Sequence, residues 1–238
     1  MLRARPQARS VAALLQDATI AAVVPVLDEA ATIAGVLTEL RQVGIGRVIV
    51  VDGGSSDGTA EIAREAGAVV ISELRRGYGR ACAAGAAIAG SDIVVFLDGD
   101  GSDDPAFIPQ LLRCIVEDGA ALALGARSGR EPGAMLAHQM LGNRLVSLLV
   151  RLLHGVRVDD VPPLRAIRAD VLTGLALREM TYGWPTEMIV KTAKAGLPIA
   201  QVPVRTRRRA GGESKIAGRL WPSLMAGLGM VRVVLLTR

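Results

Sequence analysis

Short apolar runs alternate with amphipathic segments along the first half of the chain. Apolar runs of strand length predict buried β-strands, and they cover residues 19–26, 47–51, 68–72, 93–97 and 121–126. The segments between them have helical periodicity or helix-forming composition, and they cover residues 33–40, 59–67, 80–89 and 105–118. Strands that alternate with helices of this length predict βαβ units, and therefore a mostly parallel sheet with helices on its faces.

The pattern is weaker in the second half of the chain. A loop is expected at residues 128–134, helices at 136–153 and 183–196, and an extended strand at 198–206. The last residues are apolar with scattered arginines. Such a segment is typical either of a helix pair in the core or of a helix lying in a membrane interface.

Three parts are therefore expected along the chain. Residues 1–17 would form a basic arm; a targeting leader is not expected, because Asp17 interrupts the apolar stretch and no small-residue cleavage site follows. Residues 18–215 would form one α/β domain, and residues 216–238 the apolar tail. A membrane-spanning helix is not expected either, because no uninterrupted apolar run reaches the roughly 18 residues that a span requires.

Acidic residues directly follow the fourth of these strands. The segment DIVVFLDGDGSDDP places Asp98 and Asp100 two residues apart at the strand end, where both side chains can point to the same side. Carboxylates this close repel each other unless a cation lies between them, and Mg²⁺ or Mn²⁺ prefers such oxygen ligands. We therefore predict a divalent-metal site at this pair. An EF-hand is excluded because Asp103 and Pro109 stand where its glycine and glutamate belong, and Asp103 and Asp104 are expected to start the next helix.

Another aspartate lies at the end of a neighbouring strand. In VVDGGSSDGT, Asp52 ends the strand and two glycines let the backbone turn close to a ligand. Ligands of parallel α/β sheets bind beyond the carboxyl ends of the strands, so Asp52 and Asp98 are expected at one site. The segment GYGRACAAG is expected to supply backbone donors or flexibility. It is not a dinucleotide fingerprint, because Cys82 stands where the third glycine belongs, and a Rossmann dehydrogenase is excluded.

Composition limits the possible ligands. The formal net charge is +5, carried almost wholly by arginine, whose planar fork suits phosphate oxygens. The partner could be nucleic acid, an anionic membrane surface or a phosphorylated substrate. Aromatic residues make up only 3% of the chain, which argues against single-stranded nucleic acid because stacking platforms are scarce. Cys82 and Cys114 are expected to be free thiols, and His138 and His154 lack the spacing of metal ligands or a catalytic triad.

Taken together, an ordered set of motifs resembles the inverting family 2 glycosyltransferases of the GT-A fold. The resemblance is to the branch similar to dolichyl- and polyprenyl-phosphate sugar synthases, and it runs from about residue 19 to residue 215. The motifs are PVLDEA, VVDGGSSDGT, GYGRA, FLDGDGSDDP, GAR, PLRAIR, GWPTEM and VPVRTRRRAGGESK. The resemblance implies a Rossmann-like α/β fold, with a mostly parallel sheet flanked by helices and a C-terminal helical tail.

The resemblance also implies roles for individual residues. The metal-binding and catalytic pair would be Asp98 and Asp100, with Glu187 in a helix that borders the acceptor. The nucleotide-sugar donor would contact Pro25, Leu27, Glu29, Asp52, Gly77, Arg80 and Asp98, with Asp52 reading the base. Donor or acceptor phosphates would bind Arg127, Arg165, Arg209 and Lys215.

Four places depart from the pattern of that family. Asp28 replaces the usual asparagine of the first motif, and Gly53 replaces a second aspartate in the next. Ser102 stands where polyprenyl-phosphate synthases often have glutamine, and their SGFRA becomes PPLRA at residues 162–166. These positions bear on the base contacts, a third metal ligand and the acceptor-phosphate site.

The function implied is metal-dependent transfer of a sugar from a nucleotide sugar, by family habit a UDP-sugar, to a polyprenyl phosphate. The protein would lie peripherally at the cytoplasmic face of the cell membrane and would not bind nucleic acid. A phosphate acceptor is already largely ionised near neutral pH and needs no strong base. Two alternatives remain open. A soluble or glycan hydroxyl acceptor would need a general base, for which Glu187 is the candidate, and a non-catalytic nucleotide-sugar-binding module would need neither.

Overall fold

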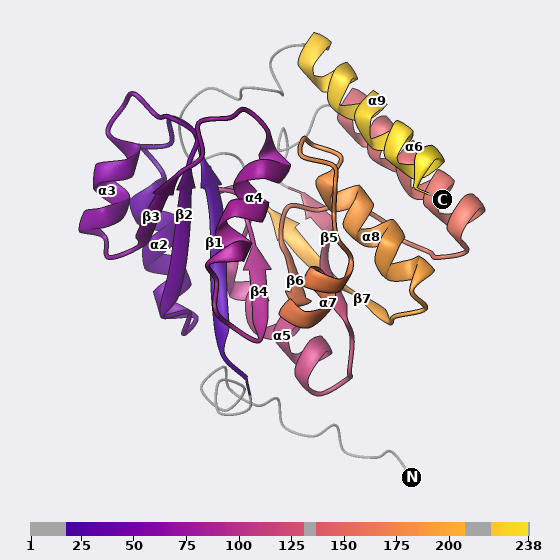
Figure 1. Ribbon diagram of the computed structural model, residues 1–238, viewed down its shortest axis with the longest axis horizontal. Helices are drawn as coiled ribbons and strands as arrows, with labels where there is room; N and C mark the ends of the chain where they lie inside the picture. The colour runs from indigo at the N-terminus through magenta and orange to yellow at the C-terminus, as the bar shows by residue number, and fades with distance from the viewer. Residues whose placement is uncertain (1–17, 131–136, 208–219, 238) are drawn as a thin grey trace.

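The computed structural model describes residues 18–130, 137–207 and 220–237, which are built around one seven-stranded sheet (Figure 1). The strands are β1 (Ile20–Val26), β2 (Arg47–Asp52), β3 (Val69–Ser72), β4 (Ile93–Phe96), β5 (Leu122–Arg130), β6 (Arg165–Arg168) and β7 (Ile199–Thr206). Their order across the sheet is β3-β2-β1-β4-β6-β5-β7. All pairs are parallel except those of β6, which is antiparallel to β4 and β5. The prediction of a mostly parallel α/β sheet is confirmed.

Helices cover both faces of this sheet. One face carries α2 (Ile33–Gln42), α3 (Thr59–Glu65) and α5 (Ile108–Val116). The other carries α4 (Tyr78–Ala87), α6 (Ala137–His154), α8 (Trp184–Lys194) and α9 (Leu220–Leu236), and the short segments are η1 (Pro105–Phe107) and α7 (Ala169–Gly174). The apolar face expected around Leu37 and Leu40 is buried in α2, so the helical period of the sequence marks the side that meets the sheet.

Two parts of the second half differ from the prediction. Residues 165–168, expected only as an arginine motif, form β6 because Ala166 and Ile167 pack into the cores on opposite faces of the sheet. The strand β5 continues into the segment expected as a loop. Its last residues pair with β7 up to Thr206, after an irregularity between Arg127 and Gly129. Pairing with distant strands therefore extends the sheet beyond what periodicity reveals.

The strand order reverses between β1 and β4, and this reversal brings three strand ends together. In the sheet register, Val26 at the end of β1 lies opposite Asp52 of β2, and Val23 lies opposite Phe96 of β4. The loops that leave β1, β2 and β4 therefore meet at one edge. In parallel α/β folds such a reversal is where ligands bind.

The end of the chain packs on the domain through α9. This helix lies along α6 and α8, with Val233 and Val234 buried against them (Figure 1). At the end of α6, His154 Nε2 donates a hydrogen bond to the carbonyl of Val234 (2.9 Å). A Cβ added to Gly183 would lie 2.8 Å from Val233 Cγ2, so α9 closely approaches the start of α8. Among the described residues, no helix has both the length and the apolar character needed to cross a membrane.

Candidate active site

The loops that follow β1 and β2 bind each other through aspartate side chains. Asp28 Oδ1 accepts a hydrogen bond from the N–H of Ser56 (2.8 Å), and Asp57 Oδ2 accepts one from the N–H of Ala30 (3.0 Å). Asp28 has a positive φ of 47°, a left-handed conformation that aspartate and asparagine tolerate better than most residues. Asp28, which replaces the asparagine usual in the family, therefore joins the first motif to the second.

The residues expected to contact the donor gather where β1 and β2 end. The buried carboxylate of Asp52 accepts hydrogen bonds from the N–H groups of Gly54 (3.1 Å) and Ser55 (3.2 Å), which hold the turn after β2. The other expected donor residues of the first motif lie at the adjoining end of β1: Pro25, Leu27 and Glu29. Leu27 is exposed and Glu29 is buried. The structure brings these four residues together, and their contacts with a donor stay predictions.

Three carboxylates lie together after β4. The N–H of Asp98 donates to Asp103 Oδ2 (3.0 Å), and the N–H of Ser102 donates to Asp100 Oδ1 (2.9 Å), so the loop folds back on itself. Burial, and then the charge of Asp100, raises the pKa of Asp98 to about 6. Burial, and then the charge of Asp98, raises the pKa of Asp103 to about 8. The loop therefore concentrates negative charge in a site that disfavours it.

The interpretation of Asp103 as a helix-start residue is wrong. Its side chain turns inward because its backbone forms a bridge with Thr206 of β7, a contact between segments that are far apart in the sequence. Asp104 alone has the expected role. Its Oδ1 accepts a hydrogen bond from the N–H of Ala106 (3.0 Å) at the start of η1.

The carboxylates of Asp98 and Asp100 fit a divalent cation that takes its other ligands from a bound molecule. Asp98 Oδ1 is buried and has no hydrogen-bond partner among the described residues, and such an oxygen calls for an ion or a ligand. Within the same residues, no group of three or more His, Cys, Asp or Glu side chains is placed to hold a metal by itself. Mg²⁺ is commonly bound by one or two carboxylates together with substrate phosphates, and this pair offers that arrangement.

Arg165 is completely buried in a cage of aromatic rings. Its pairing with Phe96 across β6 and β4 places the guanidinium carbon 4.8 Å from the centre of that ring and 5.0 Å from the centre of the Trp184 ring. Burial raises the pKa of Asp98, whereas the charge of Arg165 and a hydrogen bond from Tyr78 lower it. Arg165 thus acts on Asp98 from inside the domain. Its expected phosphate contact stays a prediction.

The aromatic residues around this cage were not among the expected site residues. The chain has only two tyrosines, two tryptophans and two phenylalanines. Four of these six lie around Arg165 or close to Asp98: Tyr78, Phe96, Tyr182 and Trp184. The rings of Tyr78 and Tyr182 stack with their centres 6.0 Å apart. The sequence could have indicated these four site residues, because aromatic residues are scarce in the chain and each of the four falls within or directly beside a conspicuous motif.

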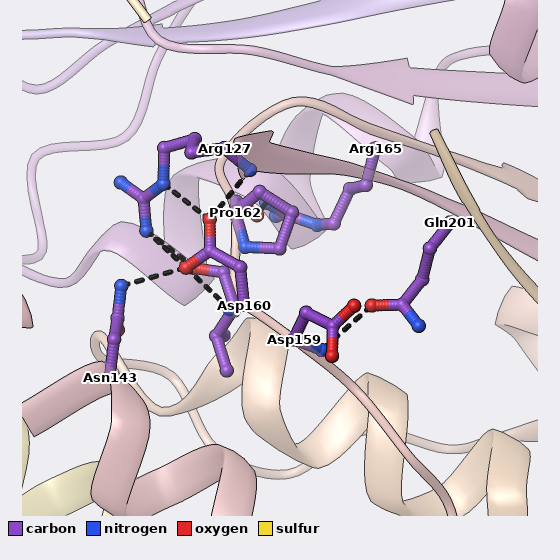
Figure 2. A network of polar contacts seen from close by, with 8 residues as sticks. Arg127, Asn143, Asp159, Asp160, Pro162, Arg165 and Gln201 are labelled. Carbon is purple, nitrogen blue, oxygen red and sulfur yellow. Dashed lines mark hydrogen bonds and ion pairs between the residues drawn. The ribbon is translucent and has the colours of Figure 1, made fainter. Parts of the chain in front are cut away.

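Arg127 of β5 is held in a largely buried ion pair (Figure 2). Its Nε and Nη2 donate to the two carboxylate oxygens of Asp160, at 2.5 and 2.7 Å, and its own N–H donates to the same carboxylate at 3.2 Å. Asn143 of α6 adds a hydrogen bond to Asp160 (2.8 Å). Arg127 also lies close enough to Asp98 and Asp103 for its charge to act on both. Its phosphate contact stays a prediction, and the other two expected phosphate ligands lie outside the described residues: Arg209 and Lys215.

The start of α4 is bound to the segment before α8. The N–H groups of Gly79 and Arg80 donate to the carbonyls of Thr181 (3.2 Å) and Met180 (3.1 Å). Gly77 has a φ of 145°, and a Cβ added there would lie 2.2 Å from the carbonyl oxygen of Met180. The N–H groups of Gly79 and Arg80 are therefore used in hydrogen bonds within the chain. Donor contacts of Gly77 and Arg80 stay predictions.

Replacing Gly77 with alanine should lower the free energy of unfolding by about 3 kcal/mol, because the new Cβ adds backbone strain and overlaps a carbonyl that cannot swing away. Gly58→Ala is the matched control, since Gly58 also has a positive φ (88°) but an added Cβ there meets nothing within 4 Å. That control should lose only about 1 kcal/mol. Urea denaturation measures both values. Equal losses would mean that the contact with Met180 contributes nothing.

Glu187 is buried near the start of α8 with both carboxylate oxygens engaged. Oε2 accepts hydrogen bonds from the N–H groups of Arg178 (2.9 Å) and Glu179 (2.7 Å). Oε1 forms an ion pair with Lys191 Nζ one turn later (2.8 Å). The carboxylate thus anchors the segment that carries Tyr182. Its expected role at the acceptor stays a prediction.

Similar sequences occur in proteins that are already classified. The chain matches the family model described as glycosyl transferase family 2 over residues 21–175. An uncharacterized glycosyltransferase of Mycobacterium tuberculosis is 34% identical over 218 residues, which cover 90% of this chain and 97% of that relative. The undecaprenyl-phosphate mannosyltransferase of Micrococcus luteus is 31% identical over 214 residues, which cover 82% of this chain and 86% of that enzyme.

A solved structure is similar over nearly the whole chain. Glucosyl-3-phosphoglycerate synthase from Mycobacterium tuberculosis, in complex with Mn²⁺, uridine diphosphate and glucosyl-3-phosphoglycerate, has a TM-score of 0.75 and 26% sequence identity. The match covers 98% of this chain and 85% of that chain. The expected GT-A architecture is confirmed.

Proposed function

The chain belongs to glycosyl transferase family 2, and from that premise we propose that it moves a sugar from a uridine diphosphate sugar to a polyprenyl phosphate. The reaction would take place at the cytoplasmic face of the cell membrane. The similarity to an undecaprenyl-phosphate mannosyltransferase along 82% of the chain supports this acceptor class. The uridine diphosphate held by the solved glucosyl-3-phosphoglycerate synthase supports the donor.

The donor would bind at the edge where β1, β2 and β4 end. Asp52 and the interlocked loops beside it would hold the nucleoside, and Asp98 and Asp100 would hold Mn²⁺ or Mg²⁺ together with the diphosphate. A divalent ion so placed neutralises the charge that gathers on the leaving diphosphate. The chain itself fixes the shape of this loop, because the N–H of Asp98 donates to the Asp103 carboxylate and the N–H of Ser102 donates to the Asp100 carboxylate.

The hydrogen bonds and the ion pair of Glu187 are the observation that favours a phosphate acceptor over a hydroxyl acceptor. Its carboxylate is engaged by two backbone N–H groups and by Lys191, so it is poorly placed to take a proton from a hydroxyl. A phosphate oxygen is already ionised near neutral pH and attacks without such a base. A phosphate acceptor therefore agrees with the site as it is built.

The second candidate acceptor is the free hydroxyl group of a small phosphorylated molecule. The solved glucosyl-3-phosphoglycerate synthase, which is similar to 98% of this chain, supports it. Under this alternative Glu187 would have to leave Lys191 in order to accept the proton of the attacking hydroxyl.

Transfer of label into an organic phase tests the proposed function. The purified full chain would be given labelled UDP- and GDP-sugars and Mn²⁺ or Mg²⁺, with either a short polyprenyl phosphate or 3-phosphoglycerate as the acceptor. Metal-dependent label in the lipid phase would support the proposal. Label that stays in water while nucleotide is released would support the hydroxyl alternative. If no donor releases nucleotide, both are wrong and a binding module remains.

Glu187→Gln separates the two acceptor classes. For a phosphate acceptor we expect kcat to stay within about threefold of wild type, with a stability loss of about 1–3 kcal/mol because a partly buried ion pair is broken. Lys191→Gln is the matched control, since it breaks the same pair but keeps the carboxylate. A kcat loss of about a hundredfold or more in Glu187→Gln alone, with a changed pH profile, would assign the base to Glu187 and contradict the phosphate acceptor.

A further inference from the structure

The exposed sides of α6 and α9 have an unusual composition. Every exposed side chain that the structure describes on these two helices is leucine or arginine: Arg144, Leu145, Leu148, Arg151, Leu152 and Leu153 on α6, and Leu228, Arg232, Leu235 and Leu236 on α9. We call these ten side chains the Leu/Arg face. Leu152 and Leu236 are 68% and 64% exposed, respectively. A helix surface that faces only water is normally rich in charged and polar residues of both signs.

The rest of the described surface does not share this composition. Exposed positions of α3 are Glu61, Arg64 and Glu65, an ordinary polar surface. The other large apolar side chains that are exposed in the described residues are scattered over separate elements: Leu27, Val69, Leu74, Ile88 and Tyr182. Single exposed apolar residues are normal, whereas a contiguous group marks a contact surface.

The two helices are fixed side by side, so their exposed stripes form one surface. Val146 and Val150 of α6 and Val234 of α9 point into the same core, and the hydrogen bond from His154 to the Val234 carbonyl joins the helices where α6 ends. Exposed residues of α9 recur at positions 228, 232, 235 and 236, the spacing of one helix face. The Leu/Arg face is therefore a preformed surface.

We propose that the Leu/Arg face binds an anionic lipid surface, with its leucines inserted at the boundary between headgroups and acyl chains. The sequences of α6 and α9 contain no acidic residue, so the charges among the leucines are all positive. Arginine can bury its stem along apolar surface and place its guanidinium among lipid phosphates. A second copy of the chain is less suited to this face, because a two-fold contact would bring together two surfaces whose charges are all positive. This inference rests on the proposed function and identifies the surface by which the enzyme would meet a lipid acceptor.

The position of this face agrees with that role. Asn143 of α6 binds Asp160, which pairs with Arg127 beside the acidic loop, so α6 is in direct contact with the walls of the site. The first residue of the Leu/Arg face, Arg144, directly follows Asn143 in α6. A membrane bound along the Leu/Arg face would therefore begin next to the part of α6 that contacts Asp160.

The test is sedimentation of the full chain with vesicles, without any nucleotide sugar. Wild type should bind vesicles of equimolar phosphatidylcholine and phosphatidylglycerol, more weakly at high salt, and bind pure phosphatidylcholine poorly. The double variant Leu148→Glu/Leu152→Glu should bind at least about tenfold more weakly, because it removes two inserted side chains and adds repelling charges. Arg151→Gln and Arg232→Gln should each weaken binding to the anionic vesicles about fivefold. Ile88→Glu is the matched control at an exposed apolar residue at the far end of α4, and it should bind like wild type.

The same variants separate this inference from the proposed function. The Leu148→Glu/Leu152→Glu variant should keep transfer to a short, water-dispersed polyprenyl phosphate, since both leucines are exposed on the outer side of α6. Vesicle binding without transfer by the wild type would contradict the proposed function and support the surface. Unchanged vesicle binding in the double variant, or no binding by the wild type, would overturn the surface. Light scattering offers a further test of the Leu/Arg face as a lipid-binding surface. That assignment would also be overturned if the wild type formed a dimer and the double variant were a monomer that still bound vesicles.

Discussion

Asp100→Asn should reduce sugar transfer by about a thousandfold, equivalent to ~4 kcal/mol of transition-state stabilisation. The asparagine oxygen can still accept the hydrogen bond from the Ser102 N–H, so the loop after β4 should keep its shape. What the substitution removes is the negative charge that, with Asp98, fits a divalent cation. Affinity for the uridine diphosphate–Mn²⁺ complex should fall together with kcat, which titration calorimetry and single-turnover transfer measure.

Asp104→Asn is the control for this effect. Asp104 lies in the same loop, but its carboxylate caps η1 and pairs with Arg207 (2.8 Å) rather than facing the other carboxylates. Its replacement should leave transfer within about threefold of wild type, because a partly exposed ion pair contributes little. Full activity in Asp100→Asn, or activity that persists after chelation of divalent ions, would contradict the metal role of this pair.

Asp160→Ala should lower the free energy of unfolding by about 3–5 kcal/mol, the largest stability effect expected in this chain. The substitution leaves the largely buried guanidinium of Arg127 without its partner and removes the acceptor of the Asn143 side chain (Figure 2). Because Asp160 joins β5, α6 and the segment before β6, the loss should also make α6 open more readily. Urea denaturation measures the first effect, and hydrogen exchange of α6 amides measures the second.

Two variants show whether the loss comes from the unpaired charge. Asp170→Ala breaks an ion pair in which the Asp170 side chain is 65% exposed and the Arg168 side chain is 49% exposed. It should lower the free energy of unfolding by less than about 1 kcal/mol. The double variant Arg127→Met/Asp160→Leu removes both buried charges and should be more stable than Asp160→Ala. If the double variant loses as much as the sum of two independent substitutions, Arg127 and Asp160 do not stabilise each other and the explanation is wrong.

Much of the site could be predicted because it depends on local sequence. Strand ends followed by aspartates place Asp52, Asp98 and Asp100 at one edge of a parallel sheet, and this rule holds whatever the other residues are. Glu187 and Lys191 are four residues apart, so a helix brings them into contact. The engagement of Glu187 by the N–H groups of Arg178 and Glu179 was not predictable, because it depends on how an irregular segment folds back onto α8.

The residues that were misread or missed depend on distant partners. Asp103 is buried because the strand β7, about 100 residues later, comes alongside the acidic loop. The aromatic cage of Arg165 was missed because the strand of this residue inserts between β4 and β5, whereas its phosphate contact stays a prediction. No periodicity in a short segment reports such insertions, since a strand of four residues has too few positions to show a pattern.

The sequence by itself determined the alternation of strands and helices, the burial of each apolar face and the acidic strand ends, because these follow from side-chain spacing along a single element. Only the tertiary structure decided which charges are available to a ligand and which are used within the chain. Arg127 and Asp160 are separated by 33 residues and meet only because β5, α6 and the segment before β6 converge. The outer side of α6 and α9 likewise became a single Leu/Arg face only once their inner sides had packed together. Packing of distant segments sets burial, and burial sets the energy of every charge at this site.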